Sequence, residues 1–240
     1  MNVGKKPNHL ENRTVKLCVL KNKIILVTGA SRGLGYQASL KLAGKGAHVI
    51  ISARTVGALE ELSDKILDSG GRVTLAPLDL CKDKDFQLVS KTIYEKFGRI
   101  DILIHSASIA IPMAPIQTIA KTDLLKFFEA NAIVTQRVIQ MIHPLLKIKK
   151  KSIALFIQDT TNSNNKKFLG IYNATRAASR EIISAYSAER KRLGPKILTF
   201  EPNPMPTKIR QVLFPGEDKT KLSTCENEAI RMVNFITSHA

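Results

Sequence analysis

The chain has 240 residues, of which 44% are hydrophobic and 24% are charged, as in an ordinary globular domain with a sizeable core. Its three cysteines are scattered without a CxxC pair, which argues against a disulfide framework or a metal site and favours a reducing, cytoplasmic compartment. The 37 lysines and arginines outnumber the 20 acidic residues, and the net charge is +17. Because no nucleic-acid motif accompanies this charge, we expect a solvated basic surface and no specific nucleic-acid partner. No apolar run approaches the roughly 20 residues of a membrane span, so no membrane association is expected.

Residues 1–20 are expected to form a polar N-terminal extension, and residues 21–240 a single domain. From residue 23 onward, short apolar runs rich in β-branched residues alternate with segments whose apolar residues recur every three or four positions. The expected strands cover residues 24–28, 48–53, 73–76, 100–104, 153–157 and 197–200. Helical patterns cover residues 56–66 and 124–145, among others. The alternation predicts a Rossmann-type, doubly wound α/β fold: a mostly parallel sheet of about six strands with helices on both faces.

The first expected strand runs directly into the segment Thr28-Gly29-Ala30-Ser31-Arg32-Gly33-Leu34-Gly35, which a helix follows. Glycines permit unusual backbone dihedrals and let the main chain approach a diphosphate, whose charge is stabilised at a helix N-terminus. This segment is therefore predicted to bind a dinucleotide through Gly29, Ser31, Arg32, Gly33, Leu34 and Gly35.

The pattern TGxxxGxG of this loop resembles the signature of the short-chain dehydrogenase/reductase family, and the resemblance covers about residues 20–207. Residues 210–218 are similar to a branch of bacterial NADP-dependent oxoacyl and ketone reductases. The resemblance implies a homodimer or homotetramer. It also implies cofactor contacts near the adenine from Asp79 and Leu80, near its ribose from Ser106 and Ala107, and at the nicotinamide end from Pro202 and Thr207. The family usually has Asn-Asn-Ala-Gly where this chain has His105-Ser106-Ala107-Ser108.

The charge after the second expected strand indicates which cofactor is bound. An acidic residue there binds a ribose 2′-hydroxyl, whereas a 2′-phosphate requires cations. This chain places Arg54 at that point and Arg32 in the glycine loop. Two arginines without an acid suit phosphate recognition, so the sequence predicts NADP(H) in preference to NAD(H).

The resemblance also implies a set of catalytic residues, which this chain matches only in part. Tyr172 corresponds to the tyrosine acid/base, and Asn131 to the asparagine that supports a proton relay. The lysine four residues after the tyrosine is replaced by Arg176, and the serine thirteen residues before it by Asp159. Arg176 cannot deprotonate to pass on a proton, and a carboxylate at residue 159 would oppose an oxyanion and raise the pKa of Tyr172.

Two hypotheses account for these departures. Asp159 and Arg176 flank one pocket in the family geometry, so they are expected to pair as carboxylate and guanidinium. Alternatively, Thr160 or Thr161 supplies the missing hydroxyl, and strand alternation favours Thr161.

Two functions of different classes follow. The first is an NADP(H)-dependent oxidoreductase that transfers hydride between the cofactor and a small carbonyl or alcohol substrate, with Tyr172 as general acid/base. The second is a catalytically impaired relative that binds the dinucleotide and has a binding or regulatory role.

Overall fold

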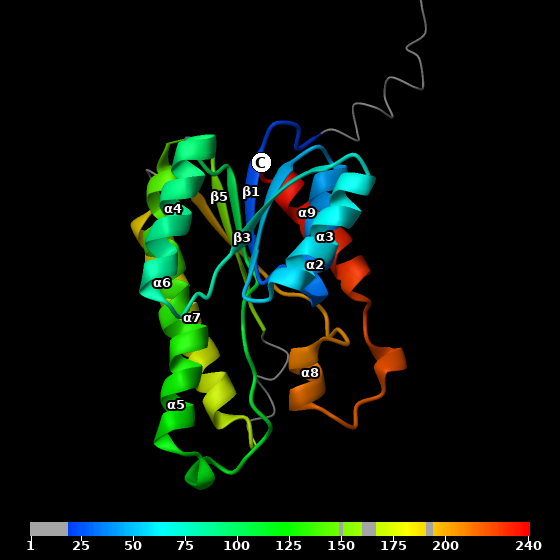
Figure 1. Cartoon of the computed structure of the whole chain (residues 1–240). Coiled ribbons are helices and arrows are strands. Elements are labelled where there is room, and N and C mark those ends of the chain that lie inside the picture. Colours follow the sequence, from blue (N-terminus) through cyan, green and yellow to red (C-terminus); the bar gives the residue numbers. More distant parts are fainter. Residues whose placement is uncertain (1–18, 149–150, 160–166, 191–193) are drawn as a thin grey trace, which may run out of the picture.

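The computed structural model describes residues 19–148, 151–159, 167–190 and 194–240. The described part contains one sheet of six strands in the order β3-β2-β1-β4-β5-β6, and all its neighbouring strands are parallel. The strands, seen edge-on in the middle of Figure 1, are β1 (Ile24–Thr28), β2 (His48–Ala53), β3 (Arg72–Pro77), β4 (Ile102–His105), β5 (Ile153–Ile157) and β6 (Lys196–Phe200). Their continuous apolar runs reflect a sheet covered on both faces.

One face of the sheet is covered by α2 (Gly33–Gly44), α3 (Val56–Asp68) and α9 (Cys225–Thr237) (Figure 1). Their buried side chains form one hydrophobic core with alternate residues of the strands, such as Leu42, Leu59 and Met232 with Val27 and Ile51. A helix buries the face on which apolar residues recur every three or four positions, which the spacing of Leu59, Leu62 and Ile66 illustrates.

The opposite face carries α4 (Asp83–Phe97), α6 (Val134–Lys147) and α7 (Gly170–Glu189) (Figure 1). A second core lies here, in which Val138 and Ile142 of α6 pack with Leu26 and Phe156 of the strands. The short helix α5 (Lys121–Phe128) leads into α6 through a π-helical turn at Glu129–Ile133. With one core on each face of the sheet, the protein has three layers: helices, sheet and helices.

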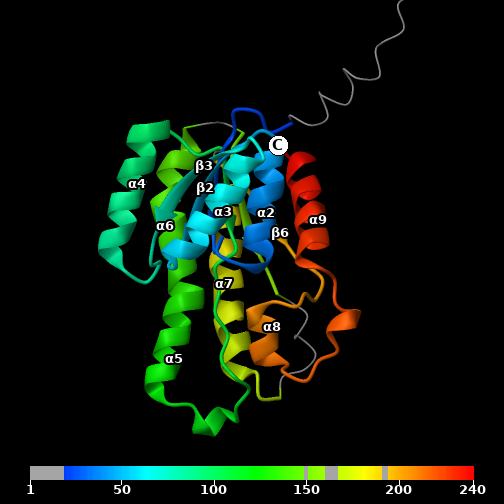
Figure 2. The same cartoon turned by 45° about the vertical axis from the view of Figure 1, so that its right-hand side comes forward.

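A small lobe extends beyond the carboxyl ends of the strands (Figure 2). It contains α8 (Lys208–Leu213) and the 3₁₀ turns η1 (Ile116–Thr118) and η3 (Lys219–Lys221). Leu213 of α8 is buried with Leu169 and with Tyr172 of α7. This small cluster holds α8 over the carboxyl end of the sheet.

The topology places a crevice at the carboxyl ends of β1 and β4. The chain leaves β1 toward β2 and β3 on one side, and it returns to β4 and β5 on the other. The connections after β1 and β4 therefore run apart, and ligands of doubly wound sheets bind where this occurs.

The predicted fold class is confirmed, and each expected strand is found within two residues of its predicted bounds. Two details differ. Leu20, placed in the polar extension, is fully buried against α2 and β1 residues, so the folded unit starts before residue 21. The helical pattern of residues 124–145 is interrupted by the π-helical turn around Asn131. In the part of the chain that the structure describes, no helix is both long and apolar enough to cross a membrane.

Candidate active site

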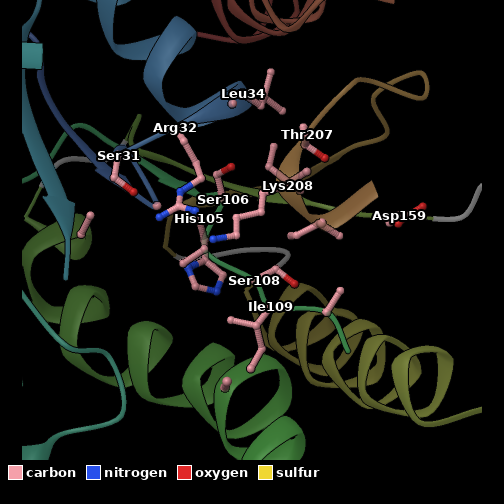
Figure 3. Close-up of a pocket in the computed structure, with 18 of the residues that line it drawn as sticks. Ser31, Arg32, Leu34, His105, Ser106, Ser108, Ile109, Asp159, Thr207 and Lys208 are labelled. Atoms are coloured by element: carbon pink, nitrogen blue, oxygen red, sulfur yellow. The ribbon is translucent and has the colours of Figure 1, made fainter. Parts of the chain in front are cut away.

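The crevice is a cleft of about 440 Å³ at the carboxyl end of the sheet. Its walls come from the segments that follow β1, β2, β4 and β5, from the start of α7, and from α8. Residues far apart in the sequence, such as Arg32, Ser106 and Lys208, therefore face one space (Figure 3).

The glycine loop after β1 forms the floor of the cleft and leads straight into α2, which begins at Gly33. Gly29 has φ = +73°, and a Cβ on it would lie 2.7 Å from the backbone nitrogen of Ala107. A Cβ on Gly35 would lie 2.4 Å from the carbonyl oxygen of Gly29. Only glycine fits these two positions, because a side chain would collide with backbone that cannot move aside. The main chain is thus open to a phosphate at the N-terminus of α2, as the sequence predicts.

The two predicted phosphate-binding arginines both line this cleft. Arg32 precedes α2 and Arg54 follows β2, and both are exposed. Neither side chain has a hydrogen bond or an ion pair with another described residue. This distinguishes them from Arg210 of α8, which forms two hydrogen bonds of 2.5 Å with the carboxylate of Glu217.

Ser31 and Leu34 of the glycine loop also line the cleft, as do the residues predicted near the adenosine, namely Asp79, Leu80, Ser106 and Ala107. Asp79 accepts a 3.1 Å hydrogen bond from the backbone of Cys81 through Oδ1. This bond fixes the carboxylate at the start of the turn after β3. The residues that would hold a dinucleotide are therefore brought together, and the cradle formed by the glycines suits its diphosphate.

His105 takes the place of the family's first asparagine at the end of β4. Its Nδ1 is hydrogen-bonded to Oγ1 of Thr28 at 2.8 Å, so the ring ties β4 to β1. Burial, with a smaller contribution from the charge of Arg176, lowers the pKa of His105 to about 3. A neutral imidazole therefore lies beneath the middle of the cleft at physiological pH.

Tyr172 lies in the first turn of α7 and is 4% exposed. Its hydroxyl donates a 2.8 Å hydrogen bond to Oδ2 of Asp159, which lies just beyond β5. Burial raises the pKa of Tyr172 well above its usual value, and the charge of Asp159 and this hydrogen bond raise it further against the opposing charges of Arg176 and Arg210. Tyr172 is therefore held in its protonated form.

The predicted pairing of Asp159 with Arg176 is wrong. Arg176 is 7% exposed, and its Nη2 donates a 2.6 Å hydrogen bond to the carbonyl oxygen of Ile157. Its buried Nε has no partner among the described residues, while Asp159 accepts its bond from Tyr172. The sequence suggested a pair because both side chains belong to one pocket, but the carbonyl at the end of β5 binds the guanidinium instead. The competing hypothesis rests on Thr161, which lies outside the described residues, as does Thr160.

Asn131 is buried in the π-helical turn, and all of its amide groups are engaged. Its Oδ1 accepts hydrogen bonds from Oγ of Ser108 at 3.0 Å and from the backbone of Ile109 at 2.9 Å. Its Nδ2 donates to the carbonyl oxygen of Ile109 at 3.0 Å and to Oγ1 of Thr175 at 3.1 Å. This satisfied set of bonds ties the segment after β4 to α7.

The segment after β6 brings Pro202 and Thr207 to the cleft, as predicted. Next to Pro202, Asn203 is held by the buried carboxylate of Glu228 in α9, which accepts bonds from the backbone of Asn203 at 3.0 Å and from its Nδ2 at 2.9 Å. Although burial opposes ionisation, hydrogen bonds from Arg231, Asn203 and Ser223 lower the pKa of Glu228. The hydroxyl of Thr207 accepts a 3.2 Å bond from the backbone of Arg210 and caps α8.

Several residues of the site were not found from the sequence. Lys208 extends into the cleft, and its only sequence signal is that it follows Thr207 (Figure 3). Gln158 lines the cleft with both amide atoms buried and unpartnered among the described residues. Nothing in the sequence pointed to Glu228 as a residue of the site, because it lies in α9, which begins more than 20 residues after Asn203. Within the described ranges, no cluster of three potential metal ligands occurs.

Comparison with known proteins agrees with this geometry. Residues 23–218 match the model of the family described as short chain dehydrogenase. The chain belongs to the short-chain dehydrogenase family. It is 26% identical over 210 residues to the uncharacterized oxidoreductase YciK of Escherichia coli, covering 86% of this chain and 82% of that protein. It is 24% identical over 207 residues to the uncharacterized oxidoreductase Lmo0432 of Listeria monocytogenes, covering 85% and 83%.

Solved structures of this family share the fold. A short chain dehydrogenase structure from Pseudomonas syringae has a TM-score of 0.83 at 26% identity, covering 88% of this chain and 87% of that one. A protein from Shigella flexneri that was crystallised with NADP has a TM-score of 0.81 at 25% identity, covering 88% and 90%. The fold described above is therefore that of a family of oxidoreductases, of which the Shigella flexneri structure contains NADP.

Proposed function

We propose that this short-chain dehydrogenase is an NADP(H)-dependent reductase of a small carbonyl compound, with Tyr172 as its general acid. One observation carries the proposal. A single cleft joins a glycine loop and two unpartnered arginines to a buried tyrosine on the other side of the sheet's switch point. When bound there, the cofactor supplies the hydride.

The residues present fit NADP(H). Glycine positions that accept no Cβ leave room for a diphosphate beside the N-terminus of α2. The guanidinium groups of Arg32 and Arg54 suit a 2′-phosphate, and the cleft has no acidic side chain at the end of β2 to bind a 2′-hydroxyl. The Shigella flexneri relative crystallised with NADP supports the same choice.

Tyr172 suits reduction better than oxidation. Reduction of a carbonyl requires a proton donor, whereas oxidation of an alcohol requires a base. Burial and the neighbouring Asp159 raise the pKa of Tyr172, so its hydroxyl keeps its proton at neutral pH. To donate to a substrate oxygen, this hydroxyl must turn away from Asp159, to which it is bonded at 2.8 Å.

Asp159 makes the reaction slower than in a site with serine. A carboxylate beside the substrate oxygen opposes the negative charge that develops there, whereas a serine hydroxyl would donate a hydrogen bond to it. The guanidinium of Arg176 offsets part of this effect from beneath, although it is bonded to the Ile157 carbonyl. We therefore infer low turnover.

The experiment is NADPH oxidation with a panel of ketones, oxoacyl thioesters and quinones, performed alongside direct titration of NADPH. The proposal expects turnover of at least one class and its loss in Tyr172→Phe, with NADPH affinity retained. Tyr172→Phe removes only the hydroxyl, so its unchanged affinity for NADPH controls for misfolding.

One arrangement favours a second candidate function. Tyr172, Asp159, Arg176 and Asn131 are all engaged in bonds within the protein. A dinucleotide-binding protein with a regulatory role would need no more than this. Tight NADPH binding with no turnover on any of the panel compounds would support this candidate and contradict the reductase.

A further inference from the structure

Lys208 is the first residue of α8, and its side chain extends into the cleft (Figure 3). Its nitrogen points toward the side of the cleft where Arg32 and His105 lie (Figure 3). The side chain of Lys208 has no hydrogen bond or ion pair with any described residue. A flexible cation is thus held over the glycine loop without a counter-ion.

The backbone that carries Lys208 is fixed in place. The hydroxyl of Thr207 caps α8, and its methyl group comes within 3.4 Å of the position of a Cβ on Gly33. Two residues after Lys208, Arg210 binds Glu217 through two bonds of 2.5 Å and stacks on the ring of Phe214 at 4.8 Å. The first turn of α8 therefore lies directly above the start of α2.

The charges that line the cleft are unbalanced. Among the residues that the structure describes, five cationic side chains line it, namely Arg32, Arg54, Arg176, Lys208 and Arg210. Glu217 neutralises Arg210, and the two acidic side chains of the lining, Asp79 and Asp159, are bonded to Cys81 and Tyr172 respectively. Cations that converge without counter-ions favour binding of an anion between them.

The position of Lys208 distinguishes between the two anionic parts of NADP(H). Arg54 follows β2, at the adenosine side of the sheet order, whereas Tyr172 and Asp159 lie beside β5, at the reaction side. Lys208 reaches between them, toward the loop after β1 and the end of β4, where His105 and Ser106 lie (Figure 3). The middle of the cleft is where the diphosphate would lie.

We propose that Lys208 is a cofactor-positioning residue that binds the diphosphate from α8, on the side of the cleft opposite the glycine loop. This inference rests on the proposed cofactor. Arg32 and Arg54 then serve the 2′-phosphate, and Lys208 serves a group that NADP(H) and NAD(H) share. An ammonium group suits this task because it presents three donors on a flexible stem.

The test is calorimetric titration of the full chain with NADPH, NADH and adenosine 2′-monophosphate at fixed ionic strength. Adenosine 2′-monophosphate carries the 2′-phosphate but no diphosphate. We expect Lys208→Met to lower the affinities for NADPH and NADH by the same factor, roughly ten- to a hundredfold, because a hydrogen bond to a charged group is lost. Binding of adenosine 2′-monophosphate stays within about twofold of the wild type, as expected for a contact that it does not make.

Two further variants make the result specific. Lys208→Arg keeps the charge and is expected to retain most of the affinity. Lys219→Met removes an exposed lysine of η3 that does not line the cleft, and it is expected to leave all three affinities unchanged. A Lys208→Met protein that melts like the wild type excludes a folding defect.

The outcomes separate the two proposals. If the wild type binds NADPH but Lys208→Met binds it equally well, the role of Lys208 is overturned and the cofactor proposal stands. A loss confined to NADPH and adenosine 2′-monophosphate would place Lys208 at the 2′-phosphate and contradict the diphosphate assignment. If the wild type binds neither NADPH nor NADH, both proposals fail.

Discussion

The two ends of the cleft differ in how their polar groups are used. At the proposed adenosine end, the side chains of Arg32 and Arg54 face the cleft without partners among the described residues, and so does that of Lys208 in the middle of the cleft. At the reaction end, the hydroxyl of Tyr172 and the guanidinium of Arg176 are bonded to other parts of the protein. One end is arranged for an external anion, and the other is satisfied internally.

This contrast shows that cofactor binding and chemistry depend on different properties of the chain. Binding requires backbone shape and net charge, which glycines and several cations supply together. Chemistry requires a few specific groups at defined positions, so we expect the substitutions at residues 159 and 176 to change it while leaving the fold intact. If the two ends are separable, a change at one end should leave the function of the other intact.

The largest effect is expected from Gly29→Val. Its side chain would lie 2.7 Å from the backbone of Ala107 in a backbone conformation with φ = +73°, so the loop must distort. We expect loss of NADPH affinity by more than about a hundredfold, together with a lower free energy of unfolding. Calorimetry and urea denaturation measure both effects.

Gly57→Ala in α3 is the matched control, because nothing lies within 4 Å of its new Cβ. This change is expected to leave binding unaltered and to stabilise the helix by up to about 1 kcal/mol. If Gly29→Val binds NADPH with an affinity close to that of the wild type, the assignment of this loop to cofactor binding is contradicted.

The next effect is a gain of turnover when the reaction end is restored to the family pattern. In Asp159→Ser with Arg176→Lys, a hydroxyl donor replaces a carboxylate next to the developing oxyanion. Since one such donor accounts for roughly a hundredfold or more in turnover, we expect kcat to rise by about that factor. The affinity for NADPH is expected to change little.

The single variants serve as controls for this double change. Each alone is expected to give a smaller gain, because the two groups act on the same tyrosine. Unchanged kcat in the double variant, with intact NADPH binding, would contradict the view that Asp159 limits the reaction.

Arg54→Met tests the adenosine end. Loss of a charge-assisted bond to the 2′-phosphate is expected to lower the affinity for NADPH by roughly ten- to a hundredfold and to leave the affinity for NADH unchanged. Arg72→Met, a change of an exposed arginine on β3 outside the cleft lining, is the control. Equal weakening of NADPH and NADH by Arg54→Met would show that Arg54 does not recognise the 2′-phosphate.

Asp159→Asn is expected to shift the pH profile of reduction. Burial and then the charge of Asp159 raise the pKa of Tyr172, so removing the charge lowers this pKa. Reduction requires the protonated hydroxyl, and kcat/KM should therefore fall at a lower pH on the alkaline side in Asp159→Asn than in the wild type. An alkaline limb at the same pH in both proteins would contradict coupling between the two residues.

The smallest effect concerns stability and His105. Its folded pKa of about 3 lies below the ordinary value of 6.5, so the unfolded chain binds more protons between these values. The contribution of His105 to the free energy of unfolding is fully present above pH 6.5. As the pH falls from there toward 3, this contribution decreases by about 1.4 kcal/mol per pH unit. In urea denaturation at pH 7 and pH 5.5, His105→Asn should lose less stability than the wild type on acidification.

The fold and the adenosine end could be predicted because their signals are local in sequence. Apolar strands alternating with amphipathic helices indicate the doubly wound sheet, and the loop from Thr28 to Gly35 lies within one strand–turn–helix unit. Arg54 and Asp79, which were predicted to contact the cofactor and line the cleft, closely follow strands, whose carboxyl ends must face the crevice.

The contacts of the reaction end could not be predicted, because they depend on which of several partners a side chain chooses. Arg176 binds the Ile157 carbonyl in preference to Asp159, and both partners lie at the same strand end. Glu228 supports Asn203 from α9, and Lys208 enters the cleft from α8, so tertiary packing alone brings them to the site. Asn131 was predicted to support a proton relay, and in the structure its amide forms four hydrogen bonds that connect the segment after β4 to α7.

The most direct test of the account is a side-by-side titration of the wild-type chain with NADPH and NADH. Unpartnered arginines at the end of β2 and in the glycine loop are the basis of the cofactor assignment. The account predicts that NADPH binds at least about tenfold more tightly than NADH, the difference expected from one charge-assisted bond to the 2′-phosphate. Equal affinity for the two cofactors, or binding of neither, would contradict it.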